Sequence, residues 1–556
     1  IIKTFENIHN DVELTISKLK KANPLIPDIV LIKDELSLSE IKSLYLQSDA
    51  LVAPSRGEGF GLPIAEAMLM GLPVITTNWG GQIDFCNDKN SWLIDYNFAF
   101  SQSHFNIYNS FWAEPSTAHL SQLLVEVYQS KKSEIIKKTE VAKDNIKSYK
   151  WDKVVEKNIN AINNYFCKFD NKISKIGWVS TWNSRCGIAS YSRRFLNYMP
   201  DDIFVFSPHD ENTYVYDDNT NLIKEDQLLP CWNFPYNNDQ NLDELYFQII
   251  TNNISSLVIQ FNFDFFDITQ LTLLFEKLIK SKTIIILVLH STIFPKEYDS
   301  NYVSLFKKLL TKCTRVLVHT LNDINRLKKL GLIDNITLLN HPIIDYKNNI
   351  SYLPSNNLKY THKATFNIVT YGFCLPMKGF SELIKAIHIL KNRNFSITLD
   401  IYSAIYNQDY YWVFQELIDL VNELSLNNFV RLHPEYIPEN KLLTILSQYD
   451  LLVFPYQKSN ESSSASVRDG LASRRPVIVT PLSIFDDVAD LTERFRGTSP
   501  DHLAQGLLEW HSKNKVNSNK LTEKSNVDRI TKIKQRSFSA VSQRLSLMIK
   551  SLEINE

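Results

Sequence analysis

The sequence contains Glu58-Gly-Phe-Gly-Leu-Pro-Ile-Ala-Glu66-Ala-Met-Leu-Met-Gly-Leu-Pro73-Val-Ile-Thr-Thr77, and a related stretch recurs as Glu461-Ser-Ser-Ser-Ala-Ser-Val-Arg-Asp469-Gly-Leu-Ala-Ser-Arg-Arg-Pro476-Val-Ile-Val-Thr480. An apolar run precedes each copy, Leu51-Val-Ala53 before the first and Leu451-Leu-Val-Phe454 before the second. Each copy therefore predicts a buried strand, a loop that opens with Glu, a helix and a second buried strand starting at Pro-Val-Ile. Such a repeat indicates a duplicated α/β lobe.

Between the two copies, apolar runs rich in β-branched residues alternate with amphipathic, helix-like segments. The predicted strands are Ile176–Ser180, Leu257–Phe261, Thr283–His290, Arg315–His319 and Phe366–Thr370. Continuous apolar strands separated by helices are typical of parallel sheets that are covered on both faces. The sequence therefore predicts an α/β fold with parallel sheets.

The repeat and the strand pattern divide the chain into three lobes and a tail. The expected parts are a partial first lobe at 1–165, a second lobe at 173–345, a third lobe at 365–520 and a charged helical tail at 521–556. The second and third lobes are predicted to close on a cleft.

Two features support these boundaries. The first lobe is partial because the opening strand and turn of the third lobe, Phe366 to Gly379, have no counterpart upstream of Glu58. The Asn- and Lys-rich stretch from Asp345 to Lys363 is predicted to be an interlobe linker, and a second boundary is predicted near Phe166 to Lys175.

Composition and charge argue against several classes of protein. The chain has 60 basic and 61 acidic residues and a net charge of -1, so it has no overall attraction to nucleic acid. Its longest strongly apolar run, Thr283 to Leu289, is far shorter than the ~20 residues that a membrane helix needs, and no signal peptide is expected. The six cysteines are scattered without CxxC pairs, which favours free thiols over zinc or disulfides. We expect a cytoplasmic protein, with peripheral association at the inner face of a membrane left open.

The repeated stretch has residues that suit a nucleotide sugar. Carboxylates accept hydrogen bonds from hydroxyls, and backbone N–H groups at a helix start hold phosphate oxygens. Glu58 and Glu66 bracket the turn Gly59-Phe60-Gly61, so the first carboxylate can face a sugar while the second reaches a ribose. This pattern resembles the E-x7-E motif of glycosyltransferase family 4, whose retaining enzymes have the GT-B fold of two Rossmann-like lobes. The resemblance extends over nearly the whole chain.

The third-lobe copy is a variant of this motif. It keeps Glu461 but has Asp469 in the second place, and Ser462, Ser463 and Ser464 stand where glycines are usual. The resemblance implies that Glu461 orients the donor sugar, that Asp469, although shorter than Glu, holds the ribose, and that the three serines also bind the donor.

A second element, Tyr371-Gly372-Phe373-Cys-Leu-Pro-Met-Lys378-Gly379, follows the predicted strand at 366–370. It is similar to the family's G-R-x4-K-G segment, whose Arg and Lys neutralise the donor diphosphate. Lys378 takes the Lys place, whereas Phe373 takes the Arg place. Arg468 could supply the missing guanidinium, since Arg can bind phosphate through two nitrogens.

Two residues of the second lobe complete the candidate site. Gly187 lies where a strand gives way to a helix, which permits a ligand to approach the backbone closely and resembles the first loop of the family's acceptor lobe. His290 ends a predicted strand, and ligands of open α/β sheets bind at the carboxyl ends of strands. The family commonly has a His there, near the reacting sugar. Gln260 and His341 belong to weaker family-like features of the cleft.

Each of these residues also has a plainer explanation. Glu58 and Glu461 could be solvated carboxylates at a helix N-terminus. Lys378 could be an exposed lysine and His290 a histidine satisfied by backbone groups. Gly187 could mark an ordinary helix start.

The resemblance implies transfer of a hexosyl group with retention, from a GDP-, UDP- or dTDP-linked sugar to a hydroxyl of a glycan or lipid-linked glycan. No cofactor is expected. No metal is expected either, since no Asp-x-Asp pair follows a strand and Asp486-Asp487 is interpreted as a solvated helix start. The segments at 461–468 and 481–486, together with those at 79–85 and 111–115, resemble multidomain bacterial polysaccharide and O-antigen transferases, which implies mannosyl or rhamnosyl transfer into a surface glycan.

The first lobe is not expected to act alone, because it lacks an acceptor lobe. Two alternatives to a transferase stay open: a catalytically inactive GT-B scaffold in a glycan-assembly complex, and a GT-B nucleotide-sugar epimerase.

Overall fold

The computed structural model divides the chain into two compact units. Unit 1 comprises Ile1–Cys167 and unit 2 comprises Lys168–Glu556. The predicted linker at 345–363 lies, apart from Asp345, outside the described residues, and so does most of the predicted boundary at 166–175. The described residues are 1–5, 11–103, 107, 109–166, 175–184, 186–199, 202–209, 223–235, 240–295, 299–345, 365–405, 408–517 and 523–555.

The second lobe, in unit 2, is built on a seven-stranded sheet in which neighbouring strands are parallel, in the order β10-β9-β8-β11-β12-β13-β14. The central strands β11 and β12 are buried along their whole length, as their continuous apolar sequences predict. The elements are β8 (Ile176–Val179), α7 (Gly187–Leu196), β9 (Ile203–Pro208), η2 (Glu225–Gln227), β10 (Leu228–Trp232), α8 (Asp243–Thr251), β11 (Ser256–Phe261), α9 (Ile268–Lys280), β12 (Ile284–Leu289), α10 (Ser300–Thr311), β13 (Arg315–Val318), α11 (Leu321–Lys329) and β14 (Ile336–Leu338).

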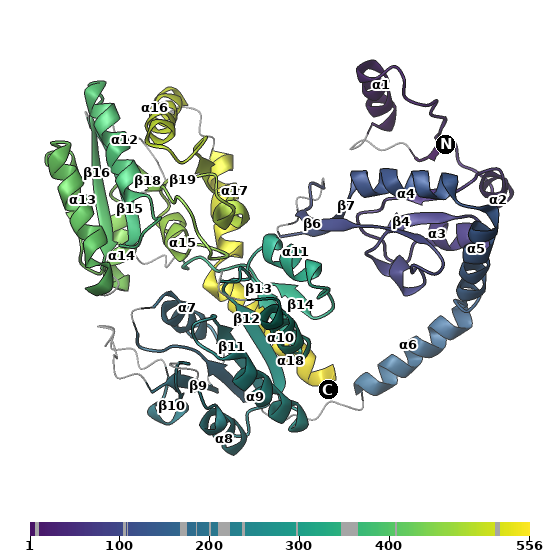
Figure 1. The fold of residues 1–556 in the computed structure, drawn as a ribbon, viewed down its shortest axis with the longest axis horizontal. Helices are drawn as coiled ribbons and strands as arrows, with labels where there is room; N and C mark the ends of the chain where they lie inside the picture. The colour runs from purple at the N-terminus through teal and green to yellow at the C-terminus, as the bar shows by residue number, and fades with distance from the viewer. Residues whose placement is uncertain are drawn as a thin grey trace. The chain divides into compact units, whose positions relative to one another are not determined.

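The third lobe has a six-stranded parallel sheet in the order β17-β16-β15-β18-β19-β20 (Figure 1). Alternate residues of its strands enter two separate cores: Ile368 packs with α12 and α13, whereas Val369 packs with α14 and α15. Helices therefore cover both faces of the sheet. The elements are β15 (Phe366–Phe373), α12 (Phe380–Asn392), β16 (Ile397–Ala404), η4 (Gln408–Tyr410), α13 (Tyr411–Glu423), β17 (Val430–His433), α14 (Glu439–Leu446), β18 (Leu451–Phe454), α15 (Ala465–Ala472), β19 (Val477–Val479), η5 (Ser483–Val488), β20 (Glu493–Arg494) and α16 (Pro500–Asn517).

The last two helices, α17 (Glu523–Gln535) and α18 (Phe538–Asn555), lead the chain from the third lobe back to the second. A parallel bridge pairs Ser537, between the two helices, with Ile343. From there α18 packs on the second-lobe sheet, where Phe538 and Val541 share a core with Trp178. The last two helices thus connect the third lobe to the second within unit 2.

Unit 1 contains the first lobe. Its strands β3, β4 and β5 form a parallel sheet that repeats the β18-β19-β20 arrangement with the same register: Leu51 pairs with Val74, as Leu452 pairs with Val477. The elements are β1 (Ile2–Lys3), α1 (Val12–Ala22), β2 (Leu31–Ile32), α2 (Leu38–Leu46), β3 (Leu51–Ala53), α3 (Leu62–Leu69), β4 (Val74–Thr77), η1 (Gly81–Asp84), β5 (Trp92–Ile94), β6 (Tyr96–Phe100), β7 (Phe111–Pro115), α4 (Thr117–Gln129), α5 (Lys132–Ile146) and α6 (Trp151–Phe166).

Among the described residues, the first lobe lacks the strand that β15 supplies in the third lobe. There β15 lies between β16 and β18, whereas β1 and β2 of unit 1 form a two-stranded sheet of their own and β3 is an edge strand. The predicted fold is confirmed: it is an α/β fold in which the partial first lobe is followed by two Rossmann-like lobes with parallel sheets. None of the described helices combines the length and the apolar character needed to cross a membrane.

Candidate functional site

A cavity of about 1190 Å³ opens between the second and third lobes of unit 2. It lies at the carboxyl ends of parallel strands, since His290 directly follows β12 and Gly372 lies near the end of β15. Of the residues that the sequence predicts for the site, the following line the cavity: Gly187, His290, Gly372, Lys378, Glu461, Ser463, Ser464 and Asp469. Residues far apart in the sequence thus meet in one place.

Lys378 presents a positive charge to the cavity. Its Nζ lies 4.1 Å from the centre of the Tyr456 ring, a cation–π contact that fixes the ammonium. Burial acts to lower the pKa of Lys378, but Tyr456 and Glu461 outweigh this effect, so the pKa is raised and the side chain is charged at neutral pH.

Gly379 makes the turn that brings Lys378 into place. Its φ of 76° is in the left-handed region, and an added Cβ would lie 1.8 Å from the carbonyl oxygen of Pro455. Only glycine fits such a close backbone approach.

The N-terminus of α15 lies beside Lys378 at the cavity. Ser464 caps this helix, and its Oγ accepts a hydrogen bond from the Val467 N–H at 3.4 Å and lies 3.1 Å from the Tyr456 hydroxyl. Tyr456 thereby connects the lysine to the helix start. Backbone N–H groups at a helix start and a nearby ammonium together suit a phosphate group.

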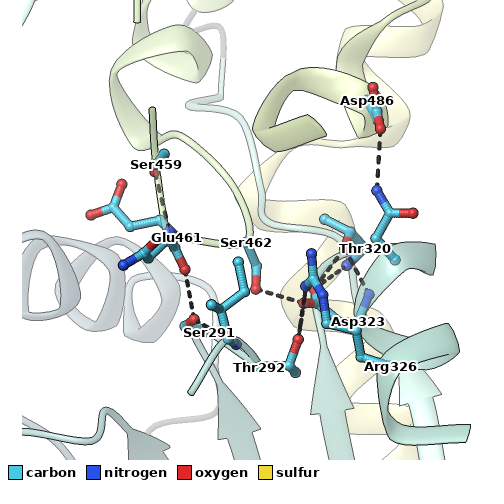
Figure 2. Close-up of polar contacts among 12 residues, drawn as sticks. Ser291, Thr292, Thr320, Asp323, Arg326, Ser459, Glu461, Ser462 and Asp486 are labelled. Carbon is cyan, nitrogen blue, oxygen red and sulfur yellow. Dashed lines mark hydrogen bonds and ion pairs between the residues drawn. The ribbon is translucent and has the colours of Figure 1, made fainter. Parts of the chain in front are cut away.

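The loop before α15 carries Glu461 and Ser462, which differ in their surroundings. Glu461 is exposed and lines the cavity, and its backbone N–H donates to Ser459 Oγ at 3.1 Å. Ser462 is buried and does not line the cavity: its Oγ donates to Asp323 Oδ1 at 2.8 Å (Figure 2). The contact with Asp323 was not predicted from the sequence.

His290 enters the cavity wall as a neutral imidazole. Its Nε2 lies 2.9 Å from Gln260 Oε1, and its ring centre lies 5.0 Å from that of Tyr191 and 5.1 Å from that of His319. Burial, with a smaller contribution from His319, places the pKa of His290 well below its ordinary value. The uncharged ring can therefore form hydrogen bonds beside a substrate without adding charge.

Asp469 forms an ion pair across the two lobes. Its Oδ1 lies 2.8 Å from a guanidinium nitrogen of Arg194 on α7, and the two side chains are only 6% and 15% exposed. Both residues line the cavity. Arg194 is absent from the sequence-based candidates, because nothing in its local sequence distinguishes it from an exposed helical arginine.

Arg468 does not lie where a second diphosphate ligand was predicted. It is buried and does not line the cavity; its guanidinium donates to the carbonyl oxygens of His341 and Ser464, at 2.9 and 2.8 Å, and pairs with Asp487. Neighbouring helical residues point about 100° apart, so α15 turns Arg468 away when Asp469 faces the cavity. Asp487 is buried as well, so the interpretation of Asp486-Asp487 as a solvated helix start is wrong for its second residue.

The cavity wall from the second lobe is rich in aromatic residues. Phe263, Phe265 and the half-buried Tyr302 line it together with the exposed Asp264. Aromatic faces pack against the apolar side of ligands, and carboxylates accept hydrogen bonds from hydroxyls. These residues were not predicted; the available signal was the aromatic run at 261–266, which starts where β11 ends.

The other predicted motif, formed by Glu58, Gly59, Phe60, Gly61 and Glu66, lies in unit 1. Glu58 Oε1 accepts a hydrogen bond from Ser55 at 2.8 Å, and Glu66 Oε2 accepts one from the Tyr45 hydroxyl at 3.1 Å. Both carboxylates of this copy thus have partners within unit 1.

Within the described ranges, no group of three or more His, Cys, Asp or Glu side chains could hold a metal ion.

Comparison with known families finds a match in the first part of the chain. Residues 13–102, all in unit 1, match the family model described as Glycosyl transferases group 1. No match to a curated protein is found.

Solved structures resemble this chain in fold. A sucrose-phosphate synthase from Thermosynechococcus elongatus has a TM-score of 0.52 at 11% identity, with 69% of this chain and 100% of that chain covered. HepE of Anabaena, solved with UDP-glucose, has a TM-score of 0.51 at 12% identity, with 68% and 99% covered. A glycosyltransferase from Rickettsia africae has a TM-score of 0.50 at 13% identity, with 70% and 100% covered. These likenesses show the GT-B fold.

Proposed function

We propose that unit 2 is a glycosyltransferase that moves a hexosyl group from a nucleotide sugar to a hydroxyl acceptor. The observation that carries this proposal is that one cavity has the charged Lys378 and the start of α15 on one wall and His290 on the other. The first wall suits a departing diphosphate, and stabilising the charge of a leaving group is the largest contribution that a protein makes to such a reaction.

The third-lobe wall binds the donor in this proposal. Lys378 and the N–H groups at Ser464 hold the diphosphate, and Gly372 allows the nucleotide to approach the end of β15 closely. Glu461 orients the sugar, and Asp469 holds the ribose while its pairing with Arg194 joins the two walls. UDP-linked donors are the first to test, because HepE was solved in complex with UDP-glucose.

The second-lobe wall binds the acceptor. His290 lies at the reaction centre, and the aromatic wall with Asp264 suits a sugar ring whose hydroxyls donate to the carboxylate. The finer parts of the proposal are that transfer proceeds with retention and without a metal, that the hexose is mannose or rhamnose, and that the acceptor is a growing surface polysaccharide.

Unit 1 carries the match to glycosyl transferases group 1 and the first copy of the motif. We propose that it does not catalyse transfer by itself, because its described residues contain neither a counterpart of Lys378 nor a second Rossmann-like lobe.

A second candidate function is a nucleotide-binding scaffold without turnover. Two observations favour it: Phe373 stands in the place of the expected Arg, and Arg468 is engaged with Asp487 instead of replacing it. The diphosphate would then have Lys378 as its main cationic partner in the third lobe.

Nucleotide release from GDP-, UDP- and dTDP-linked sugars tests the proposal. We expect the wild-type protein to release nucleotide from one of these donors, and Glu461→Ala to lower the rate by about 100-fold, the usual effect of removing one pre-organised transition-state contact. The matched control is Glu58→Ala, which changes the corresponding residue of unit 1 and is expected to alter the rate by less than about twofold.

Two other results would contradict catalysis by unit 2. If Glu58→Ala alone abolished release, catalysis would belong to unit 1. If the protein bound nucleotide tightly but released none from any donor or acceptor mixture, the scaffold would be the better description.

A further inference from the structure

Asp323 is a fully buried carboxylate with no role in the proposed binding of donor or acceptor. It lies in the first turn of α11 and forms a capping box with Thr320: its Oδ2 accepts hydrogen bonds from the Thr320 N–H at 3.1 Å and from Thr320 Oγ1 at 2.6 Å. In return, Thr320 Oγ1 accepts a hydrogen bond from the Asp323 N–H at 3.2 Å, so the capping box uses only one of the two carboxylate oxygens. The other oxygen, Oδ1, serves a different purpose.

Oδ1 of Asp323 accepts hydrogen bonds from three side chains (Figure 2). Thr292 Oγ1 donates at 2.6 Å and Arg326 at 3.1 Å, both from the second lobe, to which Asp323 itself belongs. Ser462 Oγ donates at 2.8 Å from the third lobe, 139 residues away in the sequence. Leaving a buried carboxylate without hydrogen-bond donors costs free energy, so the bond from Ser462 to Asp323 holds the two lobes together at this point.

The loop around Glu461 has two further hydrogen bonds to the second lobe. Ser291 Oγ donates to the carbonyl oxygen of Asn460 at 2.7 Å, and the Ser462 N–H donates to the carbonyl oxygen of His290 at 3.3 Å. These contacts flank Glu461 on both sides. Figure 2 shows the Glu461 carboxylate pointing away from them, so the backbone is fixed while the side chain stays available to the cavity.

We propose that Asp323 is a positioning residue for glycosyl transfer: through Ser462 it holds the loop that carries Glu461 against the strand end that carries His290. The inference rests on the proposed function of the cavity. Glu461 and His290 come from opposite walls, so the link through Asp323 sets how far apart they lie. A misplacement of about 1 Å in a substrate-orienting group can cost about 100-fold in rate.

The test is Ser462→Ala, which removes the donor on the loop and leaves the capping box of Asp323 intact. We expect kcat for nucleotide release to fall by about 10-fold or more while KM for the donor changes by less than about twofold, because the lost contact affects orientation and not donor binding. Hydrogen exchange followed by mass spectrometry is expected to speed up in the segment 457–464.

The matched control is Ser542→Ala, which removes another buried serine hydroxyl that donates one hydrogen bond, at 3.1 Å to the carbonyl oxygen of Phe195. We expect it to leave kcat and the exchange of segment 457–464 unchanged. Asp323→Asn is expected to repeat the loss of kcat and also to lower Tm, because Thr320 and Arg326 lose a charged partner as well.

Each outcome bears on one of the two proposals. Equal kcat values for the two serine variants, or a lower Tm of Ser462→Ala without a lower kcat, would show a purely structural contact and overturn the positioning role. A wild-type protein without nucleotide release would count against the proposed function. Even then, unchanged exchange in segment 457–464 of Ser462→Ala would show that Asp323 does not hold the loop.

Discussion

The Lys378→Ala variant is expected to release nucleotide from its donor at least about 100-fold more slowly than the wild-type protein, measured as initial rates at saturating donor. As the glycosidic bond breaks, negative charge grows on the diphosphate, and a fixed ammonium in a partly enclosed site stabilises that charge without reorganising. Lys378 and Arg194 are the lysine and arginine residues that line the cavity within the described part of the chain. Because Arg194 is paired with Asp469, the main effect falls on Lys378.

The control for this variant is Lys385→Ala, an exposed lysine on α12, the helix that follows Lys378. We expect the control to leave both the rate and Tm unchanged, since an exposed lysine without a fixed partner contributes little. If Lys378→Ala retained the rate to within about threefold, the diphosphate would have another cationic partner and the proposed role of Lys378 would be wrong. A parallel fall in Tm would instead point to loss of the contact with Tyr456.

The sheets could be predicted from the sequence because a strand that is buried on both faces is apolar at nearly every position. Ile368 and Val369 enter two different cores, so both must be apolar, and the strand appears as an uninterrupted apolar run. The repeat was equally informative. Leu51 of β3 and Leu452 of β18 have equivalent pairing partners, so the two copies share the register of their strands as well as their sequence pattern.

The residues that line the cavity were predictable where their position depends on local backbone. Lys378 follows a strand and precedes a glycine whose positive φ fixes the turn, so its direction is encoded within a few residues. Ser464 likewise owes its place to α15, the helix that it caps. For these side chains a short motif contains most of the geometry.

Contacts between distant segments could not be predicted in this way. Asp323 occurs in an ordinary capping-box pattern with Thr320, and the sequence offers no sign that its second oxygen binds Ser462 of another lobe. Asp469 fits a ribose by position, but its pairing with Arg194 depends on how the lobes meet. Such partners follow from tertiary packing and not from spacing along the chain.

Arg468 illustrates the same limit and leads to a second large effect. The sequence suggested a phosphate ligand because Arg468 lies within the motif, yet the structure places its guanidinium in the interior with Asp487. The backbone of Asp487 also accepts a hydrogen bond from Arg536 at 3.1 Å. A buried arginine with this set of partners is expected to contribute to the free energy of unfolding. An arginine that bound phosphate would instead contribute to the rate of nucleotide release.

Arg468→Ala is therefore expected to lower the free energy of unfolding of unit 2 by about 3–5 kcal/mol, measured by urea denaturation of the full chain. The loss is large because the Asp487 carboxylate and the carbonyl oxygens of His341 and Ser464 would remain buried after their donor is removed. Arg468 and Asp487 should also be strongly coupled, so that the double variant Arg468→Ala/Asp487→Ala is less destabilised than the sum of the two single variants.

The neighbouring ion pair between Arg494 and Asp486 provides the control, because its side chains are 31% and 43% exposed. Exposed pairs contribute about 1 kcal/mol or less, so Arg494→Ala is expected to have a small effect on the same unfolding curve. The opposite pattern would contradict the structural role: if Arg468→Ala kept the stability of the wild-type protein and lost nucleotide release, Arg468 would have to reach the diphosphate after all. Because burial of a guanidinium with a carboxylate excludes it from the cavity, a stability loss without a matching loss of release in the folded protein would assign Arg468 to the structural role.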